Sequence, residues 1–446
     1  MKKVKMLLFL LVVVLLAGCE KEKPDQVVTV TFWHVYGAQT ESPMNTLIDE
    51  FNSTVGEKEK IRVKVTSITN NNTIHENILS SAYQDPGAAE LPDMFVAYPK
   101  TVQAMPDETA LVDYEDYFSE EELKRFVPEF LEEGQIHKKQ LILPVAKSTE
   151  LLFLNKKEFD RFSSETGCTR EDLSTWEGVF QTAEKYYHWT DEKTPDVQGD
   201  GKMFFALDSH FNYFQVGMES IGESFFKEGL PDWENEAFHT VWDPYASAAL
   251  KGAMWLGEGY ATEPFQTGDS ILCEGSSASI LYFPDRVTYE DNTTEKLEIE
   301  CLPFPVFEGG EKTVIQRGAG ICTVKSTPEK EKACITFLKW ITDQKNNVKL
   351  VTDLGYMPVI QEAFDQDLKK AIKELKDPEY VSLYQTYMKI QEEYHFYVPP
   401  KVEEYLEIEE EFENQVRLIL STERMASIDG DVPLDSVWEE FKSSMK

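Results

Sequence analysis

The apolar positions near the start of the sequence follow two different periods. Residues 27–33, VVTVTFW, are β-branched and aromatic, which predicts a strand. Residues 43–51 then place apolar side chains at i, i+3, i+4 and i+7 behind Ser42, which predicts an amphipathic helix. Residues 61–65 alternate apolar and polar side chains, as a half-buried strand does. Strand, helix and strand in this order predict the parallel unit of an α/β lobe.

A second unit of the same kind follows. The pattern predicts a helix over residues 71–83 and a strand over residues 91–98. Residues 140–159 then predict two short strands around a polar turn. The stretch from about 160 to 270 is mostly helical in pattern and rich in aromatic residues, so we expect a second lobe there.

Within this stretch, one helix is predicted to start at Ser174, which has capping-box spacing to Glu177. The rest of the chain returns to strands and ends in helices. Further strands are predicted at residues 276–283, 297–305 and 318–326. A helix is predicted over residues 328–343, and three or four charged amphipathic helices follow Gln361. The acidic run EEYLEIEEEFE, residues 403–413, is typical of a solvated helix face.

The first 26 residues have the pattern of a targeting segment. Lysines precede an apolar run of about a dozen residues, shorter than the roughly 20 of a membrane-spanning helix. We therefore expect residues 1–18 to be a signal peptide. The following LAGC resembles the bacterial lipobox, which implies that Cys19 is lipidated, with residues 19–26 as a polar linker to a membrane-anchored domain.

Composition narrows the function classes. Removing residues 1–18 takes away three lysines and no acid, so the formal charge of −36 becomes −39. A nucleic-acid-binding protein needs a basic face, so that class is disfavoured. The other five cysteines include no C-x-x-C pair, and we expect buried thiols and no metal site. We interpret residues 196–205 as a surface turn instead of a calcium loop, because a closing glutamate is missing. No cofactor is expected.

Candidate chemistry gathers at the predicted strand ends, where α/β folds bind ligands. Polar and aromatic residues follow three strands, at Trp33 to Tyr36, Tyr98 to Lys100 and Lys147 to Glu150. Trp33 is either core or the wall of a ligand pocket, and the same alternatives hold for Tyr36. His34 has no serine or cysteine motif nearby that would make it a general base. A secreted glycosidase would need two acids in a glycosidase motif, and none is found, so we expect no enzyme.

Seven stretches, in this order, resemble the family 1 extracellular solute-binding proteins of ABC importers. They are VTFWHVYGAQTESPMNTLIDEFN, LPDMFVAYPKT, LPVAKSTELLFLNKKEF, TWEGVFQTAEKY, GDSILCEGSSASILYF, RGAGICTVKSTPEKEKACITFLKWITD and GYMPV. Maltose-, oligosaccharide- and glycerol-3-phosphate-binding proteins belong to this family. The resemblance covers about residues 28 to 360.

The resemblance implies an α/β, two-lobed periplasmic-binding-protein-like fold of type II, with a helical C-terminal region. It assigns 27–150 to the main part of the first lobe and 151–300 to the second, helix-rich lobe. Residues 301–446 would complete the lobes and supply the hinge crossover and the C-terminal helices. It also implies a monomeric lipoprotein at the cell surface or in the periplasm, which holds a solute between its lobes and delivers it to membrane permease subunits.

The closest local likeness is to the glycerol-phosphate branch of the family. By position within matching motifs, four positions look like that branch's ligand contacts: Ser148, Ser276 or Ser277, Gly318 and Tyr356. The branch holds phosphate with an arginine from the C-terminal helical region, and here EEYHFYVPPKVEEY has none. Its acidic contact after the second strand is replaced by Tyr98 and Lys100.

We therefore expect a carbohydrate, either a mono- or an oligosaccharide. Lys100, Lys147 and Arg317 keep an anionic ligand such as glycerol 3-phosphate open as the alternative. A surface receptor without a transport role is a further alternative. The expected ligand-binding residues are Trp33, His34, Tyr36, Tyr98, Lys100, Lys147, Ser148, Glu150, Ser276, Ser277, Arg317, Gly318 and Tyr356.

Overall fold

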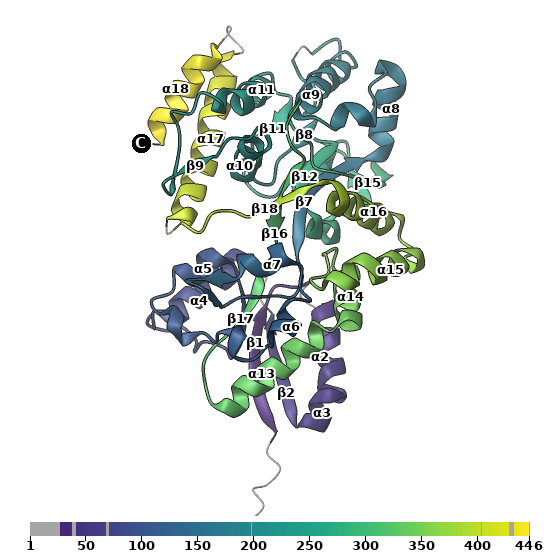
Figure 1. Ribbon diagram of the computed structural model, residues 1–446. Helices are drawn as coiled ribbons and strands as arrows, with labels where there is room; N and C mark the ends of the chain where they lie inside the picture. The colour runs from purple at the N-terminus through teal and green to yellow at the C-terminus, as the bar shows by residue number, and fades with distance from the viewer. Residues whose placement is uncertain are drawn as a thin grey trace, which may run out of the picture.

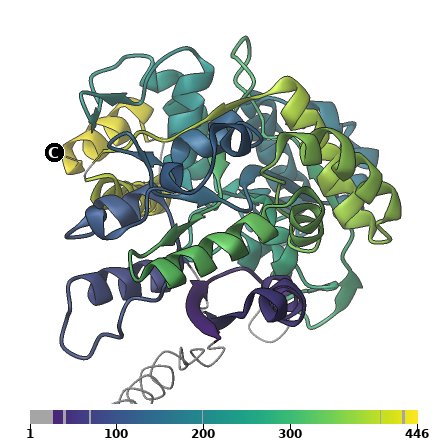
Figure 2. The ribbon, with the colours of Figure 1, turned by 60° about the horizontal axis from the view of Figure 1, so that its bottom comes forward.

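The computed structural model describes residues 27–37, 42–67, 71–197, 199–402, 404–427 and 432–445. The expected signal peptide and the expected lipidation at Cys19 lie outside these residues. Figure 1 shows two lobes, each built around its own sheet, with β7 and β16 at the junction between them. Figure 2 shows the same lobes turned about the horizontal axis.

The first lobe has a five-stranded sheet in the order β2-β1-β3-β17-β6. Its first three strands are parallel, whereas β17 runs antiparallel to both β3 and β6. The strands of this sheet are β1 (Val28–His34), β2 (Ile61–Ser67), β3 (Met94–Ala97), β6 (Leu143–Pro144) and β17 (Gly320–Thr323). The lobe also contains α2 (Pro43–Ser53), α3 (Val55–Glu59), α4 (Asn71–Ala82), α5 (Pro99–Gln103), η1 (Glu108–Ala110), η2 (Tyr114–Asp116), α6 (Glu120–Leu123), α7 (Pro128–Glu133), β4 (Gln135–Ile136), β5 (Lys139–Gln140), α13 (Pro328–Ile341) and α14 (Gln344–Thr352).

Local sequence explains the start of this lobe. The Ser42 side chain accepts a hydrogen bond from the backbone N–H of Asn45 and so caps α2, and Pro43 takes the first helical position. The apolar residues of α2 are buried, as the i, i+3, i+4, i+7 spacing predicts. Phe32 of β1 packs against Phe337 of α13, with ring centroids 6.1 Å apart. The predicted strand, helix and strand are confirmed.

The second lobe has a seven-stranded sheet in the order β11-β8-β12-β7-β16-β18, with β15 also paired to β7. All eight residues of β7 are buried. The strands are β7 (Ser148–Asn155), β8 (Phe205–Ala206), β11 (Met254–Trp255), β12 (Leu272–Ser276), β15 (Ile299–Leu302), β16 (Thr313–Arg317) and β18 (His395–Tyr397).

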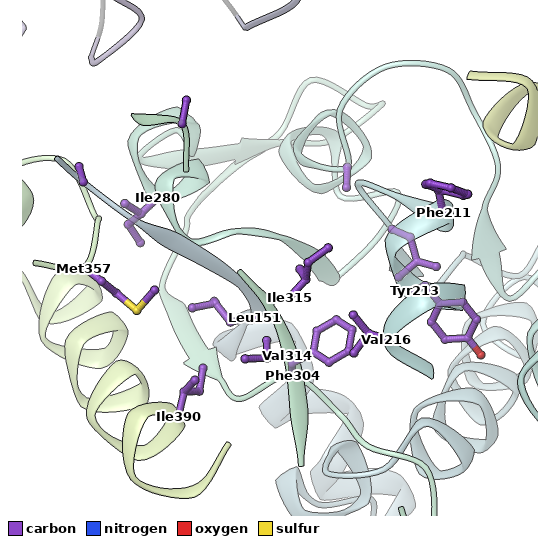
Figure 3. Packing of buried hydrophobic residues seen from close by; sticks show 14 of the residues in the cluster. Leu151, Phe211, Tyr213, Val216, Ile280, Phe304, Val314, Ile315, Met357 and Ile390 are labelled. Atoms are coloured by element: carbon purple, nitrogen blue, oxygen red, sulfur yellow. The ribbon is translucent and has the colours of Figure 1, made fainter. Parts of the chain in front are cut away.

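Helices surround this second sheet. They are α8 (Lys156–Thr166), η3 (Arg170–Leu173), α9 (Trp176–Asp191), α10 (His210–Ser220), α11 (Phe238–Leu250), α12 (Thr262–Thr267), η4 (Ser277–Tyr282), η5 (Ala363–Asp367), α15 (Leu368–Glu374), α16 (Pro378–Glu393), α17 (Tyr405–Ser427) and α18 (Leu434–Ser444). Two small hairpins, β9 (Phe226–Lys227) with β10 (Leu230–Pro231) and β13 (Arg286–Thr288) with β14 (Thr294–Lys296), complete the lobe. Figure 3 shows Leu151 of β7 and Val314 of β16 among the apolar side chains packed beside Val216 of α10.

Three segments carry the chain between the lobes. Two of them are adjacent crossovers between the sheets. One joins β6 to β7 and the other joins β16 to β17. The third segment, between α14 and α15, pairs with the first crossover through Met357 and Lys147. Gly318 has φ of +93°, and a Cβ there would lie 2.9 Å from Lys147 Cα and from the Ser148 nitrogen. Glycine is required because any side chain would push the two crossovers apart.

Two local predictions are wrong, and a third holds only in part. Residues 277–282 form the 3-10 helix η4, because Ser276 accepts a hydrogen bond from the Ala278 N–H and ends the strand. The cap of α9 is Thr175, whose hydroxyl reaches Gly178. The acidic run is only partly solvated, since Glu413 accepts from the Phe211 N–H. The buried thiols are confirmed for the five cysteines of the described chain.

Candidate ligand-binding site at the lobe junction

Arg317, the last residue of β16, stands at the centre of a charged cluster where the lobes meet. Its guanidinium donates to Glu150 Oε1 at 3.1 Å and lies 3.5 Å from Asp208 Oδ2. Glu150 is fully buried, whereas 26% of the Arg317 side chain is exposed. Burial lowers the pKa of Arg317, but Glu150 and Asp208 raise it more, so the side chain is a permanent cation.

Sheet topology explains this cluster. Because β8 and β12 are parallel, Asp208 and Glu274 come from the same end of the second sheet. Glu150 enters from β7, which runs antiparallel to β12, and its residue partner there is Ser276. Glu150 is also diagonal to Glu274 on the same face of the sheet. Four chain segments thus place charged groups at one point.

Glu150 and Glu274 form a buried carboxyl pair. Burial raises the pKa of both groups, and the charges of Glu150 and Asp208 raise that of Glu274 further, well above its usual value. At Glu150 the Arg317 charge and the Asn212 hydrogen bond oppose this rise in pKa. Asn212 donates to Glu150 Oε1 at 2.7 Å.

The crossover at Gly318 and Ala319 gathers three tyrosines. The backbone amides of both residues hydrogen-bond to Tyr98, and Tyr36 donates to the Ala319 carbonyl at 3.1 Å. Tyr356 packs edge-on against Tyr36, with centroids 5.8 Å apart. Tyr98 and Tyr356 both lie within electrostatic reach of Arg317. The expected Tyr36, Tyr98, Gly318 and Tyr356 are thus brought together with Arg317.

The predicted serines divide into two groups. Ser276 donates to the Ser148 hydroxyl at 3.2 Å, and Ser148 is the strand partner of Arg317. These two hydroxyls therefore border the charged cluster. Ser277 is fully buried in η4. Its hydroxyl oxygen has no hydrogen-bond partner in the described structure.

Lys147 lies inside the hinge and does not face the cluster. Its ammonium forms an ion pair with Glu133 of α7, and the side chains are 2% and 9% exposed. It also donates to the Gly318 carbonyl at 2.6 Å, while Gln316 donates to Glu133 at 2.8 Å. Burial lowers the pKa of Lys147 to about 7. Its hydrogen bonds are made to the protein, so its charge serves the hinge.

Lys100 is likewise paired. Its ammonium donates to Glu409 of α17 at 2.6 Å, and Glu409 belongs to the acidic run that sequence reasoning placed in solvent. Tyr405 lies beneath it, with the ammonium 6.0 Å from the ring centroid. Each of the three expected cations of the site, all within the described chain, therefore already has a carboxylate partner.

Trp33 and His34 stand at the end of β1 in different settings. His34 is buried and its Nε2 hydrogen-bonds to Asn45 of α2 at 3.0 Å. Burial lowers the pKa of His34 to about 4, so the ring is neutral at pH 7. Trp33 is half-buried and packs against the core of the first lobe. Both residues are one strand away from Tyr98, since β1 pairs with β3.

Several residues of the cluster were not predicted as site residues from the sequence. Asp208 and Glu274 each follow a short apolar run, and a lone acid at the end of such a run is the signal that could have found them. Tyr260 and Tyr282 are exposed tyrosines near the cluster: Tyr260 is within electrostatic reach of Asp208 and Arg317, and Tyr282 of Tyr260 and Tyr356. Aromatic faces beside charged hydrogen-bonding groups can hold a polyhydroxylated ring.

Within the part of the chain that the structure describes, no cluster of histidine, cysteine and acidic side chains could hold a metal ion. Among these residues, no helix is both long enough and apolar enough to cross a membrane. The charged groups, hydroxyls and tyrosines at the junction can bind a ligand by hydrogen bonding and aromatic stacking.

Comparisons with known proteins agree with this architecture. The maltotriose-binding protein of Pyrococcus abyssi is 22% identical over 289 residues, a match that covers 63% of this chain and 58% of that protein. The cyclic α-maltosyl-1,6-maltose binding protein of Arthrobacter globiformis has a similar structure, with a TM-score of 0.69 at 16% identity over 94% of this chain and 98% of that one. UgpB of Mycobacterium tuberculosis, solved with glycerophosphocholine, gives 0.71 at 13% identity over 94% and 97%.

The structural likeness shows a two-lobed fold of the maltose-binding type. The family model of bacterial extracellular solute-binding proteins matches residues 46–379, about three-quarters of the sequence. The chain belongs to the family of bacterial extracellular solute-binding proteins.

Proposed function

We propose that this protein is the substrate-binding lipoprotein of an ABC importer and that it captures a neutral carbohydrate between its lobes. A neutral ligand is favoured because each of the three cations predicted for the site already forms an ion pair with a carboxylate of the protein. Arg317 is held by Glu150 and Asp208, Lys100 by Glu409 and Lys147 by Glu133. An incoming phosphate would have to compete with these carboxylates, in a chain whose formal net charge is −36.

A sugar fits the same groups without that competition. The exposed edge of Arg317 can donate to hydroxyl oxygens, and Asp208 can accept from hydroxyl hydrogens. Ser148 and Ser276 add short hydroxyl contacts, and the tyrosines offer flat apolar faces to sugar C–H groups. Relatives whose names state maltotriose and cyclic maltosyl-maltose support this class.

The remaining parts of the proposal concern location and partners. The lipobox at Cys19 supports anchoring to the outer face of a bacterial membrane, and the family supports delivery to permease subunits. The absence of a glycosidase motif supports binding without turnover. A glycerophosphodiester is the second candidate, because a structural neighbour was solved with glycerophosphocholine.

A thermal-shift panel tests the ligand class. It compares maltotriose, other neutral oligosaccharides, glucuronate, glycerol 3-phosphate and glycerophosphocholine with the purified protein. A ligand at about 100 times its dissociation constant stabilises the folded state by about 2.7 kcal/mol, a shift of several degrees. We expect the shift with a neutral sugar and none with glycerol 3-phosphate. A shift with phosphate compounds alone contradicts the proposal, and release of shorter sugars would show an enzyme.

A further inference from the structure

Five contacts join the lobes along one side of the junction, beside the hinge pair of Lys147 and Glu133. They link α5, α7 and the start of β4 in the first lobe to the segment from β18 to the second turn of α17 in the second lobe. In Figure 1 this segment runs along the boundary above α5 and α7. The residues are Lys100, Gln103 and Phe130 from the first lobe and Phe396, Lys401 and Glu409 from the second, and we name this group the interlobe clasp.

The polar contacts of the clasp are specific. Lys100 pairs with Glu409 at 2.6 Å, and Gln103 donates to the Lys401 carbonyl at 3.3 Å. The Lys401 ammonium donates to the carbonyls of Glu132 and Gln135 at 2.9 and 2.7 Å. The Glu132 carbonyl lies in the last turn of α7, where the helix dipole favours a cation, and the Gln135 carbonyl opens β4 just after that helix.

One apolar contact completes the group. Phe130 of α7 meets Phe396 of β18 edge-on, with ring centroids 5.6 Å apart. Phe130 is fully buried, so separating the lobes at this point would expose it to water. The clasp therefore combines charge, backbone hydrogen bonds and apolar burial across one boundary.

We propose that the interlobe clasp sets the equilibrium between the joined and the separated arrangement of the two lobes, with Lys100–Glu409 as its main switchable contact. The side chains of this pair are 29% and 26% exposed, so the pair can break and reform without burying a lone charge. Because each partner stands on a different lobe, the pair exists only when the lobes are together. Lobe closure is a known hinge motion, and a contact present in one state alone shifts its population.

The test measures the interlobe distance directly. Spin labels on cysteines introduced at the exposed Glu121 of the first lobe and Glu192 of the second report the two arrangements by pulsed dipolar spectroscopy. A Cys19→Ser background removes the thiol outside the described chain, and the five other cysteines are buried and label slowly. No sugar is added, so the result does not depend on the proposed ligand.

Lys100→Met and Glu409→Gln should each lower the ratio of joined to separated molecules about two- to fivefold, the range of a partly exposed ion pair. The charge reversal Lys100→Glu with Glu409→Lys should restore most of the ratio. Raising the salt concentration to about 1 M should move the unmodified protein toward the variants, because the pair is partly exposed.

The matched control is Lys349→Met. Lys349 pairs with Glu50 at 2.5 Å, but both residues belong to the first lobe. This variant should leave the distance distribution unchanged. The proposal is overturned if Lys100→Met leaves the ratio unchanged, if the charge reversal restores nothing, or if Lys349→Met shifts the ratio as much as Lys100→Met does.

Discussion

Two ion pairs, Lys147–Glu133 and Arg317–Glu150, lie beside neighbouring crossovers but differ in how far protein encloses them. The Lys147–Glu133 pair is enclosed, with side-chain exposures of 2% and 9%, and further hydrogen bonds from Gln316 and to Gly318 complete it. The pair of Arg317 and Glu150 is open on one side, because 26% of the Arg317 side chain remains exposed. The same kind of charge pair is structural where protein surrounds it and available for binding where one edge faces outward.

The largest effect is expected at the enclosed pair. Lys147→Met leaves the Glu133 carboxylate buried without its cation, which costs about 3–5 kcal/mol of unfolding free energy. Urea denaturation measures the loss. In the double variant with Glu133→Gln most of that loss should be recovered, because no buried charge remains. A loss below about 1 kcal/mol would mean that Lys147 is solvated in solution and free for a ligand.

Arg317→Gln should act on binding more than on stability. The ligand would lose a hydrogen bond from a charged protein donor. Such a loss costs about 1.5–3 kcal/mol of binding free energy, roughly a 10- to 100-fold loss of affinity. Stability should fall less than in Lys147→Met, because Glu150 can take up a proton when its cation is absent. Isothermal titration with a sugar found by the thermal-shift panel measures the affinity. Unchanged affinity would remove Arg317 from the site.

The smallest effect concerns His34, a buried titratable group whose ring hydrogen-bonds to the neutral side chain of Asn45. Its folded pKa of about 4 lies below the unfolded value of 6.5, so the unfolded chain binds more protons in between. Stability should therefore be intact above pH 6.5 and fall as the pH decreases from 6.5 toward 4. His34→Gln should flatten that part of the stability profile, by about 1–3 kcal/mol at its acid end. An identical slope in both proteins would contradict a neutral buried ring.

Much of the fold could be predicted because its signals are local. The spacing in α2, its Ser42 cap and the alternation in β2 each act over a few residues, and each is confirmed. The strand predicted at 276–283 failed for a local reason too: the Ser276 hydroxyl captures the Ala278 N–H and turns the chain into η4. Side-chain capping competes with β-propensity, and the sequence pattern contains both signals.

The candidate site could be predicted only in part. Tyr98 and Glu150 were predicted from their places beside predicted strands, because α/β folds bind ligands at strand ends, and Arg317 was predicted as one of three cations that could hold an anionic ligand. Asp208 and Glu274 were missed because an acid in a chain with 80 acidic residues carries little information by itself. Their significance appears only when β8 and β12 bring them to the same guanidinium.

The sequence by itself determined the α/β elements, the solute-binding family resemblance and the types of residue that line the strand ends. Tertiary structure decided which charges are available, because the partner of a charge is chosen by proximity in space. Lys100 pairs with Glu409, which is 309 residues away in the sequence, and Arg317 pairs with Glu150, which is 167 residues away. Periodicity and capping extend over a few residues, whereas charge pairing and burial depend on distances that only the folded chain sets.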